Sequence, residues 1–391
     1  MRRRGAAVWV GLLLLAVAGC STASRMTQLH VPVQPTVQES FASAEDVRGL
    51  CVLVPVHTGG KTYAFLLDTG SSGVIFDEMF REELGKPQAT RRLHTGYGAD
   101  RVPFFRPPEA FLGSVDLAAG GLAGCADLSA FRVLYGCDVR GIVGMSVLRD
   151  YVVRIDFDRS EVELMTPDDL PHPEWGMAVP IEFDWAGIPV VTASVGANVK
   201  VRMDIDSGDN SYGDLSPEVF RRLGGADDSE SREVTAVSLG GIHTTKSTRV
   251  TGLRIGHYTY RDLPFTEGRW STLGLAFLAR HRVTFDFPNR KMYLMKLMQP
   301  VCPVTPCISG LILRRDSGGL VVGQVLAGSP AGEAGVRPGD VVLAIDGADA
   351  STLEPWQAAR LLMCDHDREV TLTTRRGREH HSRTFKLRRG L

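Results

Sequence analysis

An internal repeat constrains the fold of this sequence more than any other feature. Three anchor positions of a first copy recur in a second copy, each displaced by 130 residues without a gap. The matching anchors are Gly144 and Gly274, Asp156 and Asp286, and Leu164 and Leu294. Self-similarity in a fixed register indicates that one structural unit has been used twice in the chain.

A second shared feature lies upstream of these anchors, where each copy has a mainly apolar run that ends in Asp-Ser/Thr-Gly. Residues 65–71 read FLLDTGS and residues 203–209 read MDIDSGD. One such motif alone could be a turn that closes a strand, with the Asp bonded to its own backbone and the Gly at positive φ. Two motifs that keep their place within a repeat are far more specific.

Strand-like runs dominate the remainder of the repeat. They are rich in β-branched and aromatic residues and are bounded by Gly, Pro and Asp. The clearest runs are 151–157, 190–195, 249–255 and 282–287. Helical stretches are few and short, so we expect a mainly β protein.

This combination resembles the bilobal aspartic proteases of pepsin and retropepsin type. The resemblance implies duplicated pepsin-like acid-protease β-barrel lobes at 48–170 and 171–300, which supply the catalytic aspartates Asp68 and Asp206. Two carboxyl groups a few Å apart share one proton, so the pair offers an acid and a base that activate a water for peptide hydrolysis. The expected protein is an aspartic endopeptidase with a peptide or protein substrate in its cleft. Activity from homodimers of single lobes is disfavoured, because both copies keep the motif in one chain.

The resemblance also assigns roles to the residues around the two aspartates. Thr69 and Ser207 would brace the two loops through their hydroxyl groups. Gly70 and Gly208 would let backbone N–H groups approach the carboxylates, and Ser71 would bond the outer oxygen of the first aspartate. These five residues are the expected support of the active site.

A flap over the cleft is the remaining part that the resemblance implies. Residues 94–98 read HTGYG, and Tyr97 at this Gly-flanked tip is similar to the flap tyrosine of pepsin-like enzymes. A plain surface hairpin with one exposed tyrosine explains the segment equally well. The comparable place in the second copy, residues 239–242, has no aromatic residue.

The second copy departs from the family pattern at two positions. Asp209 stands where Ser, Thr or Ala is usual, and Asp204 replaces an apolar residue two positions before the second aspartate. An additional negative charge would oppose ionisation of Asp206 and raise the apparent pKa of the pair. The departures leave two alternatives: an enzyme with a changed pH range, or a catalytically inactive protease fold that binds peptides.

Residues 301–391 change in character and are long enough for a small independent domain. The stretches GLIL at 310–313, GSPAGEAG at 328–335 and RPGD at 337–340 resemble a PDZ domain. Such domains capture a peptide C-terminus as an added strand and hold its carboxylate with backbone N–H groups. The resemblance makes Gly310, Leu311 and Ile312 the ligand loop. A helix over 355–363 would form the opposite wall, although its apolar residues could equally be core.

The N-terminus indicates export and lipid anchoring. Residues 1–19 have three arginines followed by an apolar run that is short for a membrane span, as in a secretory signal peptide. The residues that precede Cys20 resemble a bacterial lipobox, which makes Cys20 the lipidation site; an ordinary signal peptide cut nearby is the alternative. Residues 20–47 would be a flexible tether. We therefore expect a protein of the cell envelope, anchored by lipid to a membrane on its periplasmic or outer side.

Six cysteines remain for an oxidising compartment. Cys125 and Cys137 lie close in sequence, as do Cys302 and Cys307, so each couple is a candidate local disulfide. Cys51 and Cys364 have apolar neighbours, which favours buried thiols over a long-range bridge. No Cys-x-x-Cys or His-Glu-x-x-His spacing occurs, so we expect no metal and no cofactor. A net charge of -1 and the lack of a polybasic block argue against a nucleic-acid partner.

Overall fold

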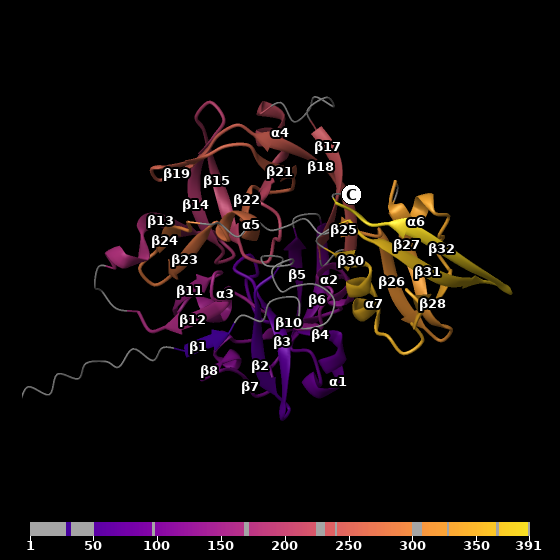
Figure 1. Ribbon diagram of the computed structural model, residues 1–391. Coiled ribbons are helices and arrows are strands. Elements are labelled where there is room, and N and C mark those ends of the chain that lie inside the picture. The colour runs from indigo at the N-terminus through magenta and orange to yellow at the C-terminus, as the bar shows by residue number, and fades with distance from the viewer. Residues whose placement is uncertain are drawn as a thin grey trace, which may run out of the picture.

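The computed structural model describes residues 29–32, 51–95, 98–167, 172–223, 231–238, 241–298, 307–326, 328–364 and 367–389. The described chain is mainly β, as the strand-like runs predict, and its α-helices have seven residues or fewer. We refer to residues 51–165 as the first β segment, to 177–296 as the second β segment, and to 307–389 as the C-terminal domain (Figure 1). The expected signal peptide, residues 1–19, and the expected lipidation site Cys20 lie outside the described residues.

The first β segment is built on a nine-stranded sheet in the order β5-β6-β9-β4-β10-β3-β2-β7-β8. Its strands are β2 (Leu53–Thr58), β3 (Lys61–Leu67), β4 (Ile75–Asp77), β5 (Ala89–Thr95), β6 (Gly98–Phe105), β7 (Ala110–Leu112), β8 (Val115–Asp116), β9 (Ala123–Ala126), β10 (Val139–Val143), β11 (Val152–Asp156) and β12 (Glu161–Met165). Its helices are α1 (Arg81–Leu84), α2 (Ser129–Tyr135) and α3 (Met145–Leu148), with 3-10 turns at Glu78–Phe80 and Leu117–Gly120.

The second β segment begins after a 3-10 turn at Pro173–Trp175. Its strands are β13 (Met177–Phe183), β14 (Pro189–Val195), β15 (Val199–Asp206), β16 (Asp214–Leu215), β17 (Ser231–Ser238), β18 (Gly241–Val250), β19 (Leu253–Ile255), β20 (Tyr258–Tyr260), β21 (Leu263–Glu267), β22 (Thr272–Gly274), β23 (His281–Asp286) and β24 (Lys291–Lys296). Its helices are α4 (Pro217–Arg222) and α5 (Leu275–Leu278). The run expected over 249–255 is divided between β18 and β19, because the chain turns at Gly252.

The expected β-barrels are not closed. In the described residues the nine-stranded sheet ends at β5 and β8, which do not pair with each other, and the sheet β16-β21-β18-β17 is likewise open. The two β segments instead share one sheet, in which β11 pairs antiparallel with β23, from Val152 opposite Asp286 to Ile155 opposite Val283. Strand β1 (Leu29–Pro32) is added to the edge of this sheet beside β12, so this part of the expected flexible tether 20–47 is instead held by strand pairing.

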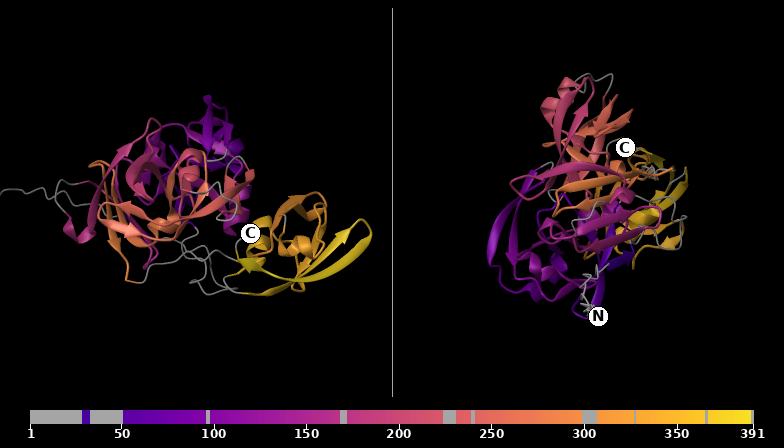
Figure 2. Two further views of the ribbon diagram at one scale, coloured as in Figure 1. Left: turned by 90° about the horizontal axis from the view of Figure 1, so that it is seen from above. Right: turned by 90° about the vertical axis from the view of Figure 1, so that its left-hand side faces the viewer.

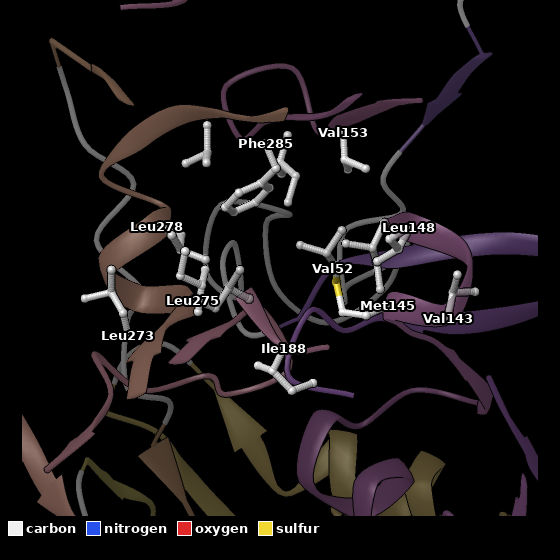
Figure 3. Packing of buried hydrophobic residues seen from close by; sticks show 14 of the residues in the cluster. Val52, Val143, Met145, Leu148, Val153, Ile188, Leu273, Leu275, Leu278 and Phe285 are labelled. Carbon is white, nitrogen blue, oxygen red and sulfur yellow. The ribbon is translucent and has the colours of Figure 1, made fainter. Parts of the chain in front are cut away.

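One hydrophobic core runs through both β segments. It includes Val143, Met145 and Leu148 from the first segment and Leu273, Leu275, Leu278 and Phe285 from the second. Figure 3 shows Leu275 and Leu278 on one side of this core, Met145 and Leu148 on the other, and Phe285 between the two groups. Because burial of apolar area is the main stabilising term in folding, this shared core fixes the two segments relative to each other.

The C-terminal domain has its own core and lies at one side of the two β segments (Figures 1 and 2). Its strands are β25 (Cys307–Ile308), β26 (Leu311–Asp316), β27 (Gly319–Val325), β28 (Val341–Ile345), β29 (Ala348–Asp349), β30 (Met363–Cys364), β31 (Glu369–Arg376), β32 (Glu379–Lys386) and β33 (Arg388–Arg389). Its helices are α6 (Pro330–Glu333) and α7 (Pro355–Leu361), the latter two residues shorter than expected. Helix α7 packs against α2 of the first β segment.

Candidate active site

Asp68 and Asp206 stand at equivalent places in the two β segments. Asp68 directly follows β3, which pairs in parallel with β10, and Asp206 ends β15, which pairs in parallel with β22. The backbone N–H of Asp68 donates to the carbonyl of Val143 at 3.0 Å. The buried runs 141–144 and 272–274 therefore hold both aspartates from behind.

The two carboxyl groups meet between the β segments and are hydrogen-bonded to each other. Asp68 Oδ1 accepts from the backbone N–H of Gly70 at 2.8 Å. Asp206 Oδ1 accepts from the N–H groups of Gly208 at 2.9 Å and Asp209 at 3.0 Å. Both side chains are half-buried, so they face solvent from a floor of fixed N–H donors.

Each glycine of the two motifs lies against the aspartate of the opposite motif. A Cβ atom at Gly70 would come within 2.3 Å of Asp206 Cγ, and one at Gly208 within 2.5 Å of Asp68 Cγ. Real Cβ atoms do not approach this closely. The glycines are therefore required so that the two loops can approach each other, and not only for a turn.

Thr69 and Ser207 form a reciprocal brace below the carboxyl pair, and both are fully buried. Thr69 Oγ1 donates to the Ile205 carbonyl at 2.7 Å and accepts from the Ser207 N–H at 3.0 Å. Ser207 Oγ donates to the Leu67 carbonyl at 2.9 Å and accepts from the Thr69 N–H at 3.0 Å. Every polar group of the brace has a partner, which makes it rigid.

Burial and charge raise the pKa of both aspartates. Burial raises the pKa of Asp68, while its hydrogen bonds with Asp206, Gly70 and Ser71 act in the opposite direction. Burial, followed by the negative charges of Asp68 and Asp209, raises the pKa of Asp206 well above its usual range. The pair therefore keeps a shared proton at pH values where isolated carboxylates would have lost theirs.

The two unusual carboxyl groups of the second copy play different parts. Asp209 lies beside the pair, where its carboxylate accepts from the Ser211 N–H at 2.8 Å and from Thr272 Oγ1 at 3.2 Å. Burial raises the pKa of Asp209. Burial and the charge of Asp184, in contrast, raise the pKa of Asp204 to about 6. Of the two, Asp209 is the one that acts on the pair.

Ser71 bonds the first aspartate in a different way from the expectation. The Ser71 hydroxyl donates to the Gly73 carbonyl at 3.0 Å and not to Asp68. Its backbone N–H takes over the bond to the Asp68 side chain. Tyr97 lies outside the described residues, between β5 and β6.

Tyr135, at the C-terminal end of α2, is a site residue that sequence reasoning missed. Its hydroxyl donates to the Gly208 carbonyl at 3.0 Å, directly after the second aspartate and its serine. Helix α2 is held by the buried Asp77, which forms ion pairs with Arg132 at 2.7 Å and Arg140 at 3.1 Å. No local motif marks this role, because Tyr135 reaches the loop across 73 residues of sequence.

The expected ligand loop of the C-terminal domain lies at the start of β26. Gly310 has a φ of 77° and its carbonyl accepts from the Leu326 N–H at 2.9 Å. The Leu311 N–H donates to Ser309 Oγ at 3.2 Å, and Ile312 is half-buried. Strand β26 is the edge of its sheet and faces α7, so an added strand would lie between them. Ala358 and Leu362 on the helix belong to the domain core, and Leu361 packs against it.

The cysteines of the described residues are all buried thiols that form no disulfide in this structure, so the expected Cys125–Cys137 disulfide is absent. Cys125 and Cys137 are not joined, because the Cys125 thiol lies 3.8 Å from the Asp77 carbonyl whereas Cys137 is hydrogen-bonded to Cys51. Cys302 lies outside the described residues. Cys307 is buried opposite Cys364 in the pair of strands β25 and β30.

The described residues contain neither a metal-binding cluster nor a membrane-spanning helix. No group of three or more His, Cys, Asp or Glu side chains in that part of the chain is placed to bind a metal ion. No helix among the same residues is both long and apolar enough to cross a membrane.

Comparison with known proteins finds two family models in the chain. Residues 54–147 match an aspartyl protease family and residues 321–376 match a PDZ domain. The aspartyl protease match contains Asp68, whereas Asp206 lies outside both matched ranges. No curated protein matches the chain significantly.

Among solved structures, this chain is similar to the photosystem II D1 C-terminal processing protease, with 23% identity and a TM-score of 0.21. The similarity covers 22% of this chain and 24% of that one, so this chain spans about a quarter of that protein.

Proposed function

We propose that this protein is an aspartic endopeptidase whose catalytic residues are Asp68 and Asp206. The observation that carries the proposal is the hydrogen-bonded pair of carboxyl groups above the reciprocal Thr69–Ser207 brace. The aspartyl protease match over residues 54–147 supports it. We also propose that residues 48–170 and 171–300 are two copies of one pepsin-like lobe, since the parallel pairs β3/β10 and β15/β22 support the aspartates in the same way.

In the proposed mechanism the carboxyl pair holds a water and shares one proton. The ionised carboxylate takes a proton from this water as it attacks the scissile carbonyl, and the protonated carboxyl donates to the carbonyl oxygen. The proton taken from the water then passes to the leaving nitrogen as the C–N bond breaks, and the proton on the former carbonyl oxygen returns to the second carboxylate. Because the nucleophile is water, no covalent enzyme intermediate forms. The N–H donors of Gly70, Gly208 and Asp209 hold both carboxyl groups in place throughout, which avoids reorganisation during the reaction.

The test is cleavage of an unstructured protein such as casein over pH 3 to 8. We expect Asp68→Asn and Asp206→Asn each to lower the rate by roughly 100-fold to 10,000-fold, and a statine-type inhibitor to block the wild type. Asp150→Asn is the matched control, because Asp150 is exposed and is not among the groups that act on the pair. If Asp206→Asn keeps full activity, the intramolecular pair is wrong. An inert wild type would favour the alternative, an inactive protease fold that binds peptides in its cleft.

We propose that the C-terminal domain binds a peptide C-terminus and recruits a substrate or partner. The PDZ match and the open edge of β26 beside α7 support this role. Gly310, Leu311 and Ile312 would hold the carboxylate, and the peptide would extend β26 as an added strand. Binding of a C-terminal peptide library, with C-terminally amidated peptides as the control, tests the proposal. Equal binding of amidated peptides would contradict it.

We propose that the chain is exported and lipid-anchored through Cys20, with residues 20–47 as its tether. The support is the sequence alone: a charged and then apolar leader before a lipobox-like stretch. Labelled palmitate should be incorporated into the wild type and lost in Cys20→Ala. Membrane association that persists in Cys20→Ala would contradict the anchor.

A further inference from the structure

Two buried thiols of the first β segment contact each other although 86 residues separate them, from 51 to 137. Cys51 is 4% exposed and Cys137 is 8% exposed, and the two side chains are hydrogen-bonded. A thiol hydrogen bond brings two sulfur atoms close together in a place that small oxidants and alkylating agents do not reach readily. The two thiols therefore form one buried pair and are not two independent thiols.

The surroundings of this pair connect separate parts of the molecule. Cys51 comes just before β2 and Cys137 just after α2, and both lie in the small core between α2 and the nine-stranded sheet. The other buried members of this core are Leu53, Leu66, Ile75, Leu128, Tyr135, Val139 and Ile142. A bond between the sulfurs would thus fix the C-terminal end of α2 to the sheet that carries Asp68.

Three consecutive residues at this end of α2 each contact a different part of the protein. Tyr135 donates to the Gly208 carbonyl in the second catalytic loop. Gly136 has a φ of 59°, and a Cβ atom there would lie 3.2 Å from Cβ of Arg360 on α7. Cys137 contacts Cys51. The position of α2 consequently determines how the active-site loop and the C-terminal domain are supported.

We propose that Cys51 and Cys137 form a disulfide bond that holds α2, and with it Tyr135, against the second catalytic loop. The bond forms as the chain folds, before the pair is buried: both thiols lose their protons, and their two electrons pass to a disulfide-bearing oxidant, which leaves as two thiols while the new S–S bond forms. Within the described residues, Cys125 is occupied elsewhere by the Asp77 carbonyl, and Cys307 lies in the other core opposite Cys364. Burial of the pair makes the bond resistant to reducing agents in the folded protein.

Peptide mapping of the full chain tests the bond without any assumption about activity. The protein is folded in a buffer of reduced and oxidised glutathione, its remaining thiols are blocked with an alkylating agent, and it is digested without reduction. We expect a linked peptide that contains Cys51 and Cys137, with Cys125 alkylated after denaturation. Alkylation of both Cys51 and Cys137, or a Cys51–Cys364 link in their place, overturns the proposal.

Thermal unfolding measures what the bond contributes. We expect the double variant Cys51→Ala/Cys137→Ala to unfold several degrees below the wild type, because the bond closes a long loop in the unfolded chain. Cys125→Ala is the matched control, since it removes a buried thiol that makes no such contact. Prior reduction under denaturing conditions should lower the unfolding temperature of the wild type more than that of the double variant. Equal shifts in the two proteins would show that no disulfide bond contributes to stability.

The positioning role of α2 rests on the proposed peptidase function, and it is measured separately from the disulfide bond. With an active wild type, Tyr135→Phe and the double cysteine variant should each lower kcat several-fold with KM little changed, because they loosen a catalytic loop and leave the cleft walls intact. A mapped Cys51–Cys137 bond in an inert protein would refute the peptidase and keep the disulfide. An unchanged kcat in both variants would refute the positioning role.

Discussion

The two β segments hold their paired aspartates with the same backbone framework but surround them with different side chains. After the aspartate, the first loop has Ser71 where the second has Asp209, and before it the first has the buried Leu66 where the second has Asp204. After α3 in the sequence, the first segment has the half-buried Tyr151. The second segment has the fully buried His281 at the equivalent position, 130 residues later. At all three positions the second segment replaces a neutral side chain with a carboxyl group or a histidine, which can gain or lose a charge as the pH changes.

Because of this difference, the position of the carboxyl pair and its response to pH depend on different residues. The reciprocal brace and the two glycines treat the aspartates alike, so the position of the carboxyl pair depends equally on both segments. The charges that act on the pair are unequal, because Asp209 has no counterpart in the first loop. We therefore expect variants of the shared framework to have equal effects in the two segments, and variants of the three titrating residues to change pH dependence.

The largest loss of activity should come from variants of the two motif glycines, Gly70 and Gly208. These variants test directly whether the two segments contribute equally to the position of the carboxyl pair. Gly70→Ala and Gly208→Ala each place a methyl group within 2.5 Å of the opposite aspartate, so the pair must separate. We expect each to lower kcat/KM by at least ~100-fold, since displacement of reacting groups by about 1 Å costs that much. Peptide-cleavage kinetics provide the measurement.

Gly73→Ala in the first loop is the control, because its nearest neighbour would be Ser146 Oγ at an ordinary 3.6 Å. A large loss in one of the two motif glycines but not in the other would show that the framework is not equivalent in the two segments.

This backbone framework could be predicted from the sequence because the motifs that determine it are local. Each Asp-Ser/Thr-Gly motif and the apolar run that leads into it lie within one short stretch, and the repeat anchors downstream match the two copies, which together predict Asp68, Thr69, Asp206 and Ser207 in one site. The open sheets were not predictable, because strand order depends on pairings such as β11 with β23 between distant residues.

Contacts between distant residues also explain what was missed in the site. The bond from Tyr135 to Gly208 and the contact of Cys51 with Cys137 bring together residues that are far apart in the sequence. Cysteine pairing was predicted from proximity along the chain, and in the first β segment the fold overrides it. The Ser71 hydroxyl differs because a closer carbonyl, that of Gly73, competes for it.

His281 should make the second segment acid-sensitive. Burial lowers its pKa from 6.5 to about 4, and its Nε2 shares a 2.7 Å hydrogen bond with the Tyr260 hydroxyl. The unfolded chain binds a proton to this group between pH 6.5 and 4 while the folded protein does not, so stability falls as the pH falls through that window. The loss approaches about 3 kcal/mol at full effect.

Urea unfolding at several pH values measures this slope. His281→Gln keeps a hydrogen-bonding group for Tyr260 but does not titrate, so its stability should fall less steeply than that of the wild type between pH 6.5 and 4. Parallel curves for the two proteins would show that His281 does not carry the acid sensitivity.

Asp204 should act in the opposite direction and by less. Its pKa is raised from 3.8 to about 6, so the folded protein binds the proton more tightly and stability is lost as the pH rises from 3.8 through 6. Asp204→Asn should therefore be more stable than the wild type at pH 7, by about 1–2 kcal/mol after allowance for partial exposure. The two proteins should be alike at pH 3; a constant difference between them at all pH values would contradict the titration.

Variants of Asp209 should change activity least, and this change should be the most specific to the candidate active site. Its negative charge raises the pKa of the neighbouring Asp206, which delays loss of the shared proton as the pH rises. Asp209→Ser copies the residue of the first loop and removes this charge. The alkaline limb of the kcat/KM profile should then move to lower pH, with activity at neutral pH reduced by ~3-fold to 10-fold while the maximum at acid pH is kept.

Asp209→Asn separates charge from shape, because the amide oxygen can still accept from Ser211 and Thr272. If both variants move the alkaline limb alike, charge is the cause. If only Asp209→Ser does, the loop has been disturbed, since the serine cannot make both bonds. If neither moves it, the charge at residue 209 does not set the pH range, and the two loops differ in sequence without differing in function.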